Sequence, residues 1–343
     1  MRVEGGATTI SWIPSEAMPG LLKLPFEMGV SHYDDPPPER LEDLQALRQA
    51  DRFRFANQVH AWIEVDGGGR ITGHGQDGGG HIGVTTLRLG KAAMAIQAVA
   101  LPDLRPQPEA HTDHVRFVQS AGGRTGAPMP RRVRRKPFVQ LISPWAFTTI
   151  AVTLHADGHV ERELIDASRF PRHWLYDERG ALMGKTGVID FKTWAAESFG
   201  DHTPWGDVRS PALVTAVETA LERELSVTIM RGGAKPAIRA LAEGETLVEQ
   251  GQEGRELFLL LDGVLSVEVD SDPLVELGPG AVVGERALLE GGRRTATLRA
   301  VTPCKVAVAD HTQVDREALE ELASGHRREE RGRDPGAPAM DQV

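Results

Sequence analysis

The sequence contains little that is typical of a secreted or membrane-spanning protein. Cys304 is the single cysteine among 343 residues, which excludes an internal disulfide framework and is typical of a reducing compartment. No apolar run approaches the ~20 residues that a membrane helix needs. Met1 is not followed by the basic segment and apolar core of a signal peptide. We therefore expect a cytoplasmic protein without a membrane span.

Positive charge is also in deficit. The chain has 39 Lys and Arg against 49 Asp and Glu, which gives a net charge of −10. Such a balance argues against a general affinity for nucleic acid, so a nucleic-acid partner is not expected. The exception is the basic run "RRVRRK", residues 131–136, which could contact nucleic acid or anionic lipid. In an acidic protein a short run of this kind is more often a solvated loop.

Residues 1–207 are predicted to form a β-rich domain, a sandwich or an open barrel, whose function the sequence does not indicate. Apolar and polar residues alternate in short stretches, and Asp66–Gly69 and Asp157–Gly158 supply tight reversals between them. The glycine run at Gly75–His81 is interpreted as another hairpin turn. Leucines at a helical spacing predict one helix over residues 37–51.

This first domain offers several histidines but no arrangement typical of a catalytic or metal centre. The candidates for metal ligation are His74, His81, His111, Asp113 and His114. They occur without paired cysteines and without two histidines one helical turn apart around a glutamate, so no metal site is predicted. No Ser/His/Asp or Cys/His combination supports a catalytic residue, and the sequence favours a protein that is not an enzyme.

A connecting helix is predicted between two domains, within residues 208–236. Ser210 and Pro211 provide an N-cap followed by proline at the first helical position, and apolar residues recur every fourth position up to Leu225. After it, residues 237–325 contain alternating strands punctuated by glycine. The charged, then Pro- and Gly-rich segment 326–343 is predicted to be a disordered tail.

Within the second domain, the stretch "GERALLEGGRRTATLRA" (Gly284–Ala300) has the residues of a pocket for an anion attached to a hydroxylated ring. Gly284 permits close approach of the backbone, and Glu285 could accept a hydrogen bond from a sugar hydroxyl. A helical turn would follow, whose free N–H groups favour an anion. Arg294 offers a planar fork that matches two phosphate oxygens. The expected ligand-binding residues are Gly284, Glu285, Arg286, Ala287, Arg294, Thr295 and Ala296.

From about Ile238 to Val308 the chain resembles the cyclic nucleotide-binding domain, a β-roll found in the catabolite activator, protein kinase regulatory subunits and cyclic-nucleotide-gated channels. The similarity lies in "GETLVEQGQEGRELFLLLDGVLSV" and in "GERALL…RRTATLRAVTPCKVAV", with the Glu285-to-Arg294 spacing of the short phosphate-binding cassette. By this resemblance Glu285 holds the ribose 2′-hydroxyl and Arg294 the cyclic phosphate, with the backbone amides of Gly284–Ala287 and Thr295–Ala296 completing the cradle.

The sequence also departs from the family. Val283 stands where the family has Phe, and Arg286 replaces an apolar residue, where it could pair with Glu285 or point to solvent. Thr295 occupies the position at which, in the kinase group, Thr accompanies a guanine preference and Ala an adenine preference. Bacterial relatives use Ser or Thr there with adenine. The ligand is therefore expected to be cAMP or cGMP, with no cofactor.

The function expected on this basis is that of a sensor whose β-roll regulates the N-terminal domain or a partner, with a possible homodimer. A helix over residues 312–325, capped by Thr312 and ended by Gly325, would act as a lid. It leaves no room for a C-terminal helix-turn-helix. The alternatives are a transcription regulator of the catabolite-activator superfamily that lacks this reader, and an enzyme whose first domain is regulated by nucleotide.

Overall fold

A computed structural model shows two compact units, Met1–Val217 and Glu218–Val343, so the first unit extends ten residues further than the expected 207. Each is described by itself. The structure describes residues 1–14, 24–28, 31–89, 92–126, 129–132, 139–197, 204–205, 212, 214–215, 220–231, 236–310, 314 and 316–332.

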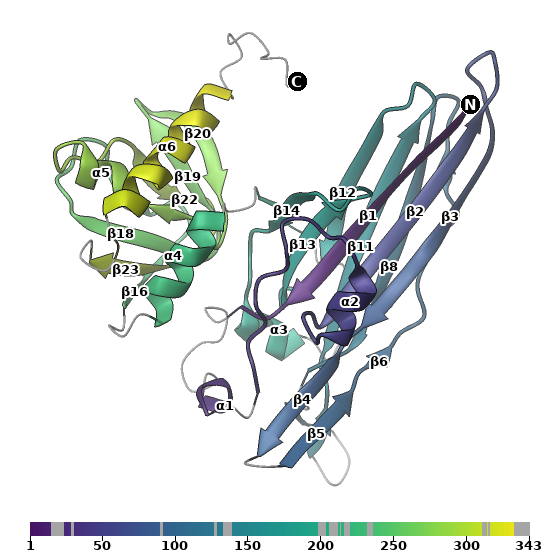
Figure 1. The fold of residues 1–343 in the computed structure, drawn as a ribbon, viewed down its shortest axis with the longest axis horizontal. Coiled ribbons are helices and arrows are strands. Elements are labelled where there is room, and N and C mark those ends of the chain that lie inside the picture. Colours follow the sequence, from purple (N-terminus) through teal and green to yellow (C-terminus); the bar gives the residue numbers. More distant parts are fainter. Residues whose placement is uncertain are drawn as a thin grey trace. The chain divides into compact units, whose positions relative to one another are not determined.

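The first unit is a sandwich of two antiparallel sheets (Figure 1). One sheet has the order β15 (Val214–Thr215), β14 (Leu182–Thr186), β13 (Arg172–Asp177), β1 (Arg2–Trp12), β2 (Phe55–Val65) and β3 (Ile71–Ile82). The other has the order β12 (Val160–Ala167), β11 (Trp145–His155), β8 (His114–Arg124) and β6 (Val99–Ala100), with β7 (Glu109–Ala110) also paired to β8. Buried side chains of β1 and β2 pack on those of β8 and β11 to form the core. The predicted mainly-β fold is confirmed.

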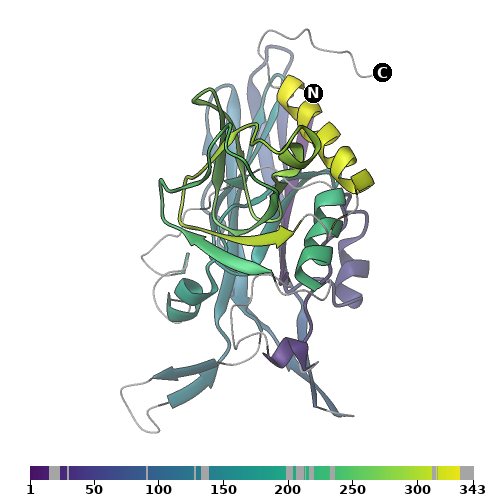
Figure 2. The same ribbon diagram turned by 90° about the vertical axis from the view of Figure 1, so that its left-hand side faces the viewer.

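Two hairpins extend from one end of this sandwich (Figures 1 and 2): β4 (Val84–Leu89) with β5 (Ala92–Gln97), and β9 (Met129–Arg132) with β10 (Val139–Ile142). The basic run begins in β9, and its residues 133–136 lie outside the described residues. The short helices are α1 (Leu24–Glu27), α2 (Leu44–Gln49) and α3 (Phe191–Glu197). The helix predicted over 37–51 is limited to α2, because Asp43 caps its N-terminus by accepting from the amides of Gln45 and Ala46.

Of the two turns predicted at glycine-rich runs of the first unit, the structure confirms one and contradicts the other. The turn at Asp66–Gly69 is confirmed, with Gly69 at a φ of 80° and its amide bonded to the carbonyl of Asp66. The turn predicted at Gly75–His81 is wrong, because these residues lie within β3 and pair with β2. Glycine is needed there for close packing: a methyl group on Gly75 would lie 2.8 Å from the ring of Trp62.

A histidine is buried in the first unit among polar partners. His173 on β13 is fully buried, and its Nε2 lies 2.8 Å from the carbonyl oxygen of Ser168. Since a carbonyl can only accept, Nε2 carries the proton and Nδ1 accepts from the hydroxyl of Ser11 at 2.6 Å. Burial lowers the pKa of His173 to about 4, so the ring is neutral at pH 7. Its hydrogen bonds link Ser11 and Ser168 in the interior of the sandwich.

The second unit is a β-roll of two four-stranded antiparallel sheets. One has the order β16 (Ala237–Leu241), β23 (Cys304–Asp310), β18 (Glu256–Asp262) and β21 (Val282–Val283). The other has the order β17 (Thr246–Val248), β22 (Thr297–Ala300), β19 (Leu265–Val269) and β20 (Asp272–Leu277). The predicted alternation of β18 is confirmed: Phe258 and Leu260 join the core of the roll, whereas Leu257, Leu259 and Leu261 join a separate cluster beneath the helices.

Three helices accompany the roll: α4 (Ala220–Arg231), α5 (Glu285–Leu289) and α6 (Arg316–Gly332). Helices α4 and α6 lie side by side on the outer face of β18 (Figure 2). Their buried residues include Leu225 and Ile229 of α4 and Leu319 and Leu322 of α6, at the spacing of one helical face.

The predicted start of the connecting helix and the predicted end of the C-terminal helix both need correction. The connecting helix begins at Ala220, since Val214–Thr215 pairs with β14 instead. The expected N-cap residues Ser210 and Pro211 lie outside the described residues. Helix α6 does not end at Gly325 but continues to Gly332, so residues 326–332 are helical and the predicted tail begins too early. The packing of α6 on α4 and α5 overrides the weak helix propensity of one glycine. Residues 333–343 and Thr312 lie outside the described residues.

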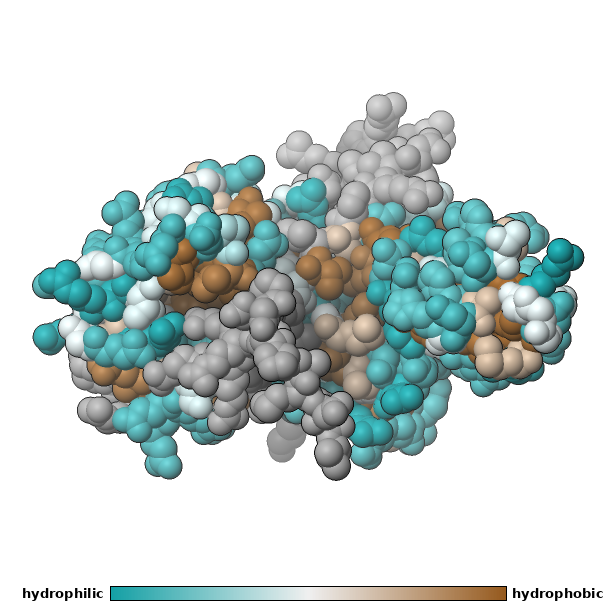
Figure 3. All heavy atoms as spheres, turned by 90° about the horizontal axis from the view of Figure 1, so that it is seen from above, coloured by the Kyte–Doolittle hydropathy of each residue, from teal (hydrophilic) through white to brown (hydrophobic). Residues whose placement is uncertain are grey.

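Polar residues dominate the surface of each unit: hydrophilic side chains cover most of the visible face, with smaller apolar areas between them (Figure 3). Among the helices that the structure describes, none combines the length and the apolar character that crossing a membrane requires.

Candidate functional site

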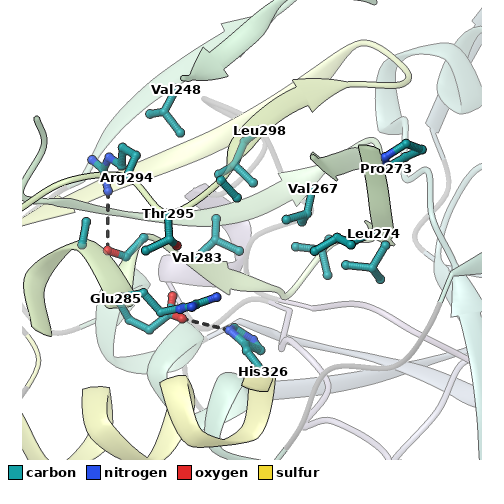
Figure 4. A pocket seen from close by; sticks show the side chains of 16 residues that line it. Val248, Val267, Pro273, Leu274, Val283, Glu285, Arg294, Thr295, Leu298 and His326 are labelled. Carbon is teal, nitrogen blue, oxygen red and sulfur yellow. Dashed lines mark hydrogen bonds and ion pairs between the residues drawn. The ribbon is translucent and has the colours of Figure 1, made fainter. Parts of the chain in front are cut away.

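The second unit contains a cavity of about 470 Å³ between α5, β19, β20 and His326 of α6. This volume lies in the range typical of small-molecule sites. All seven residues expected from the sequence line it: Gly284, Glu285, Arg286, Ala287, Arg294, Thr295 and Ala296. Figure 4 shows that the polar residues gather at one end, around Glu285, Thr295 and Arg294, while Pro273 and Leu274 lie at the other.

Gly284 places the first turn of α5 at the cavity. It stands at the N-cap in the left-handed region, with a φ of 103° and a ψ of −3°. A methyl group at this position would lie 2.8 Å from Nη1 of Arg294 and 2.8 Å from the main-chain oxygen of Glu256. Both the backbone conformation and the close approach therefore require glycine. The residue directly after it, Glu285, is 2% exposed and Ala287 is also buried.

Arg294 is a buried cation whose shortest hydrogen bonds are both to Glu256. Its Nη1 donates to the main-chain oxygen of Glu256 at 2.9 Å and lies 3.5 Å from that of Gly284, while Nη2 donates to the Glu256 carboxylate at 2.9 Å. The guanidinium also lies 5.0 Å from the ring centroid of Phe258. Burial lowers the pKa of Arg294, against the charges of Glu256 and Glu285, but an arginine stays charged. Its buried Nε has no hydrogen-bond partner among the described residues.

Glu285 is paired with the C-terminal helix and not with Arg294. Its Oε1 lies 3.0 Å from Nδ1 of His326 on α6 (Figure 4). The Nε2 of the same ring lies 3.7 Å from Oε1 of Glu222 on α4. Burial lowers the pKa of His326, but the carboxylates of Glu222 and Glu285 outweigh it and raise the pKa to about 10. The imidazole is therefore a cation at neutral pH.

The rest of the lining suits a flat apolar group. It is formed by β19, β20 and their neighbours, through Val248, Val267, Pro273, Leu274, Val275, Leu277, Val283 and Leu298. Arg286, the residue that departs from the family, lies 3.7 Å from the carboxylate of Glu290 one helical turn later. The cavity thus combines an anion-binding end, a carboxylate and an apolar end, which fits a ligand with phosphate, sugar and base in that order.

Three residues of this site were not expected from the sequence: Glu256, Glu222 and His326. Glu256 begins a strand whose alternation indicates only which side chains are buried. His326 follows Gly325, where the helix was predicted to end. Only the continued i, i+4 spacing after Leu322 could have placed His326 on the face that meets the cavity.

The five candidate metal ligands of the first unit lie on different strands and loops. His74 and His81 lie on β3, while His111 and His114 stack with ring centroids 4.4 Å apart beside His155. Across the part of the chain that the structure describes, no group of three or more His, Cys, Asp or Glu side chains could hold a metal ion.

Comparison with known proteins finds a match to one family model in the second unit. Residues 238–321 match the model of the cyclic nucleotide-binding domain, which confirms the resemblance inferred from the sequence. This match lies entirely within the second unit.

Two channels are similar to part of this chain. A cyclic nucleotide-gated potassium channel of Mesorhizobium japonicum is 37% identical over 131 residues, which are 36% of this chain and 35% of the channel. The human potassium/sodium hyperpolarization-activated cyclic nucleotide-gated channel 3 is 32% identical over 105 residues, 31% of this chain and 12% of the channel. The chain therefore spans about a third of the first relative and about an eighth of the second.

Among solved structures, a cAMP-bound kinase regulatory protein described as PfPKA-R (141–441) is 28% identical. It covers 27% of this chain and 33% of its own, with a TM-score of 0.23.

Proposed function

We propose that the second unit is a sensor for a cyclic nucleotide, cAMP or cGMP, and that the occupied roll regulates the first unit or a partner protein. The observation that carries the proposal is that Glu285 and Arg294 line one cavity of about 470 Å³ in a segment that matches the cyclic nucleotide-binding model. The similar channels are described by name as gated by cyclic nucleotides.

Arg294 is the group that binds the cyclic phosphate. A phosphate diester carries one negative charge and two free oxygens, which a guanidinium fork can engage in parallel. The buried Nε supplies a donor without a partner among the described residues, and Nη2 is bonded to a Glu256 side chain that is 56% exposed. Because the Glu256 carboxylate is exposed and water can solvate it when it leaves, the phosphate can displace it while the main-chain oxygen of Glu256 still holds Nη1.

Glu285 and Thr295 bind the remaining polar groups. The ribose 2′-hydroxyl donates to the Glu285 carboxylate, and the base lies against the apolar side chains of β19 and β20. Thr295 lines the cavity with a hydroxyl that can bond a guanine amino group, which favours cGMP. Adenine needs no such partner, so cAMP remains the second candidate ligand.

The output of the sensor comes through helix movement. A ligand shifts a protein between two arrangements only if it binds one of them better. Helix α6 reaches the cavity through His326, and α4, which packs beside α6, directly follows the segment that leads from the first unit. A nucleotide that changes the contact with α6 can therefore change α4.

Isothermal titration calorimetry with cAMP, cGMP and non-cyclic 5′-AMP tests this function. Saturable binding of a cyclic nucleotide, at least about tenfold tighter than 5′-AMP and lost in Arg294→Gln, is the expected result. Arg293→Gln is the matched control, because the Arg293 side chain is 68% exposed and faces Glu253 at 3.9 Å. Absence of heat with every nucleotide, or equal loss in both variants, would refute the proposal.

A further inference from the structure

Two buried carboxylates from different helices face one imidazole that lines the cavity. The side chains of Glu222 on α4 and Glu285 on α5 are 6% and 3% exposed, and both face His326. Burying a carboxylate without a donor or a cation is costly. The position of His326 on α6 therefore satisfies both acids at once and ties the three helices together.

The ribose-binding role of Glu285 conflicts with this arrangement. Its Oε1 accepts from Nδ1 of His326 at 3.0 Å, and the cover provided by α6 leaves the carboxylate almost without solvent access. A ribose hydroxyl that donates to Glu285 must compete with a charged donor, and charge-assisted hydrogen bonds are the stronger kind. The positive charge of His326, whose pKa is raised to about 10, strengthens this competition at neutral pH.

We propose that His326 is an internal latch: by occupying the ribose-binding carboxylate Glu285 it holds α6 against the empty cavity, and nucleotide binding releases it. The proposal rests on the proposed function of the site and adds the residue through which occupancy is transmitted. When a nucleotide takes Glu285, the hydrogen bond between His326 and Glu285 breaks. Glu222 keeps the hydrogen bond that its Oε1 accepts from the amide of Val282 at 3.1 Å. The signal is thus a changed link between α6 and α4.

The latch lowers the observed affinity for nucleotide, because only the fraction of molecules with Glu285 accessible can bind. The exchange of His326 for glutamine removes the cation but keeps a side chain whose amide can still donate a hydrogen bond to a carboxylate. We therefore expect His326→Gln to bind the cyclic nucleotide about tenfold more tightly than the wild-type chain. Glu222→Gln removes the second charge that holds the imidazole, yet keeps an oxygen for Val282, and should increase affinity by a smaller factor.

The experiment is a comparison of the dissociation constants of the full chain and its variants for cAMP and cGMP by titration calorimetry. Glu321→Gln is the matched control, since Glu321 is an exposed acid on the same helix. Tighter binding by His326→Gln than by the wild-type chain, with an unchanged control, supports the latch. Unchanged or weaker binding in His326→Gln overturns it and leaves the sensor function intact.

Two outcomes need separate treatment. If His326→Gln fails to fold, Glu222→Gln decides: tighter binding supports the latch, and unchanged or weaker binding overturns it. If the wild-type chain, both variants and the control all fail to bind either nucleotide, the proposed function fails, and the latch falls with it.

Discussion

Arg294 donates two hydrogen bonds to one residue, Glu256, through Nη1 to the main-chain oxygen and through Nη2 to the carboxylate, both at 2.9 Å. The two bonds differ in what they can contribute. The main-chain oxygen belongs to β18 and is fixed by the sheet, whereas the carboxylate is 56% exposed. The backbone of the roll therefore orients the guanidinium, and the carboxylate serves as a displaceable counter-ion.

Substitution Glu256→Gln should therefore change nucleotide affinity only slightly. Only the carboxylate of this pair is exposed and the main-chain oxygen of Glu256 still holds Arg294 in the variant, so the dissociation constant should shift by less than about fivefold. Titration with cAMP and cGMP measures this shift. A loss as large as that of Arg294→Gln would show that the carboxylate, and not the strand, positions Arg294.

Gly284 and Gly291 form a matched pair for the backbone of the cassette. Both have positive φ angles, 103° and 96°, but a methyl group on Gly291 meets nothing within 4 Å. Gly291→Ala should cost about 1–2 kcal/mol of unfolding free energy from backbone strain alone. Gly284→Ala should cost more and abolish nucleotide binding, because its methyl group would meet Arg294 and the main chain of Glu256. Denaturant unfolding and calorimetry test both; equal effects would contradict this account.

Thr295→Ala should reduce affinity for cGMP relative to cAMP. The Thr295 hydroxyl is the polar group we assign to the guanine amino group, and one hydrogen bond contributes about 0.5–1.5 kcal/mol. The ratio of the two dissociation constants should therefore change by about two- to tenfold. Competition of both nucleotides for one fluorescent analogue measures the ratio. An unchanged ratio would show that Thr295 does not read the base.

The first unit should lose stability in mild acid because of His173. Its pKa is depressed from 6.5 to about 4 in the folded state, so protons bind preferentially to the unfolded chain. The contribution is complete above pH 6.5 and falls by about 3 kcal/mol as the pH decreases toward 4. Tryptophan fluorescence follows this unfolding, since all six tryptophans lie in the first 205 residues. His173→Gln should be less stable at pH 7 but show a flatter pH profile; a profile as steep as the wild type would contradict the assignment.

Strand alternation and tight turns were predictable from the sequence because they depend on neighbouring residues. The hairpin at Asp157–Gly158 was predicted and is confirmed, with Gly158 at a φ of 99°. The turn predicted at the glycines of β3 is wrong, because Gly75 leaves room for the ring of Trp62 on the neighbouring strand β2. That packing has no signal within the glycine run itself.

The candidate site was predictable to the extent that it is contiguous in the chain. The seven residues of Gly284–Ala296 named in advance all line the cavity. The partners of its two charged groups come from β18 and α6, outside the cassette, and only the folded chain brings Glu256 and His326 to them. In the folded chain Arg294 pairs with Glu256, and Glu285 pairs with His326.

Hydrogen–deuterium exchange with and without saturating cAMP or cGMP tests the central claim, that a cyclic nucleotide binds in this cavity, most directly. The account predicts slower amide exchange in residues 284–296 on addition of the nucleotide, together with altered exchange in 316–332, and neither change in Arg294→Gln. Exchange that is unchanged in 284–296 at saturating nucleotide, or protection that appears only within residues 1–217, would contradict it.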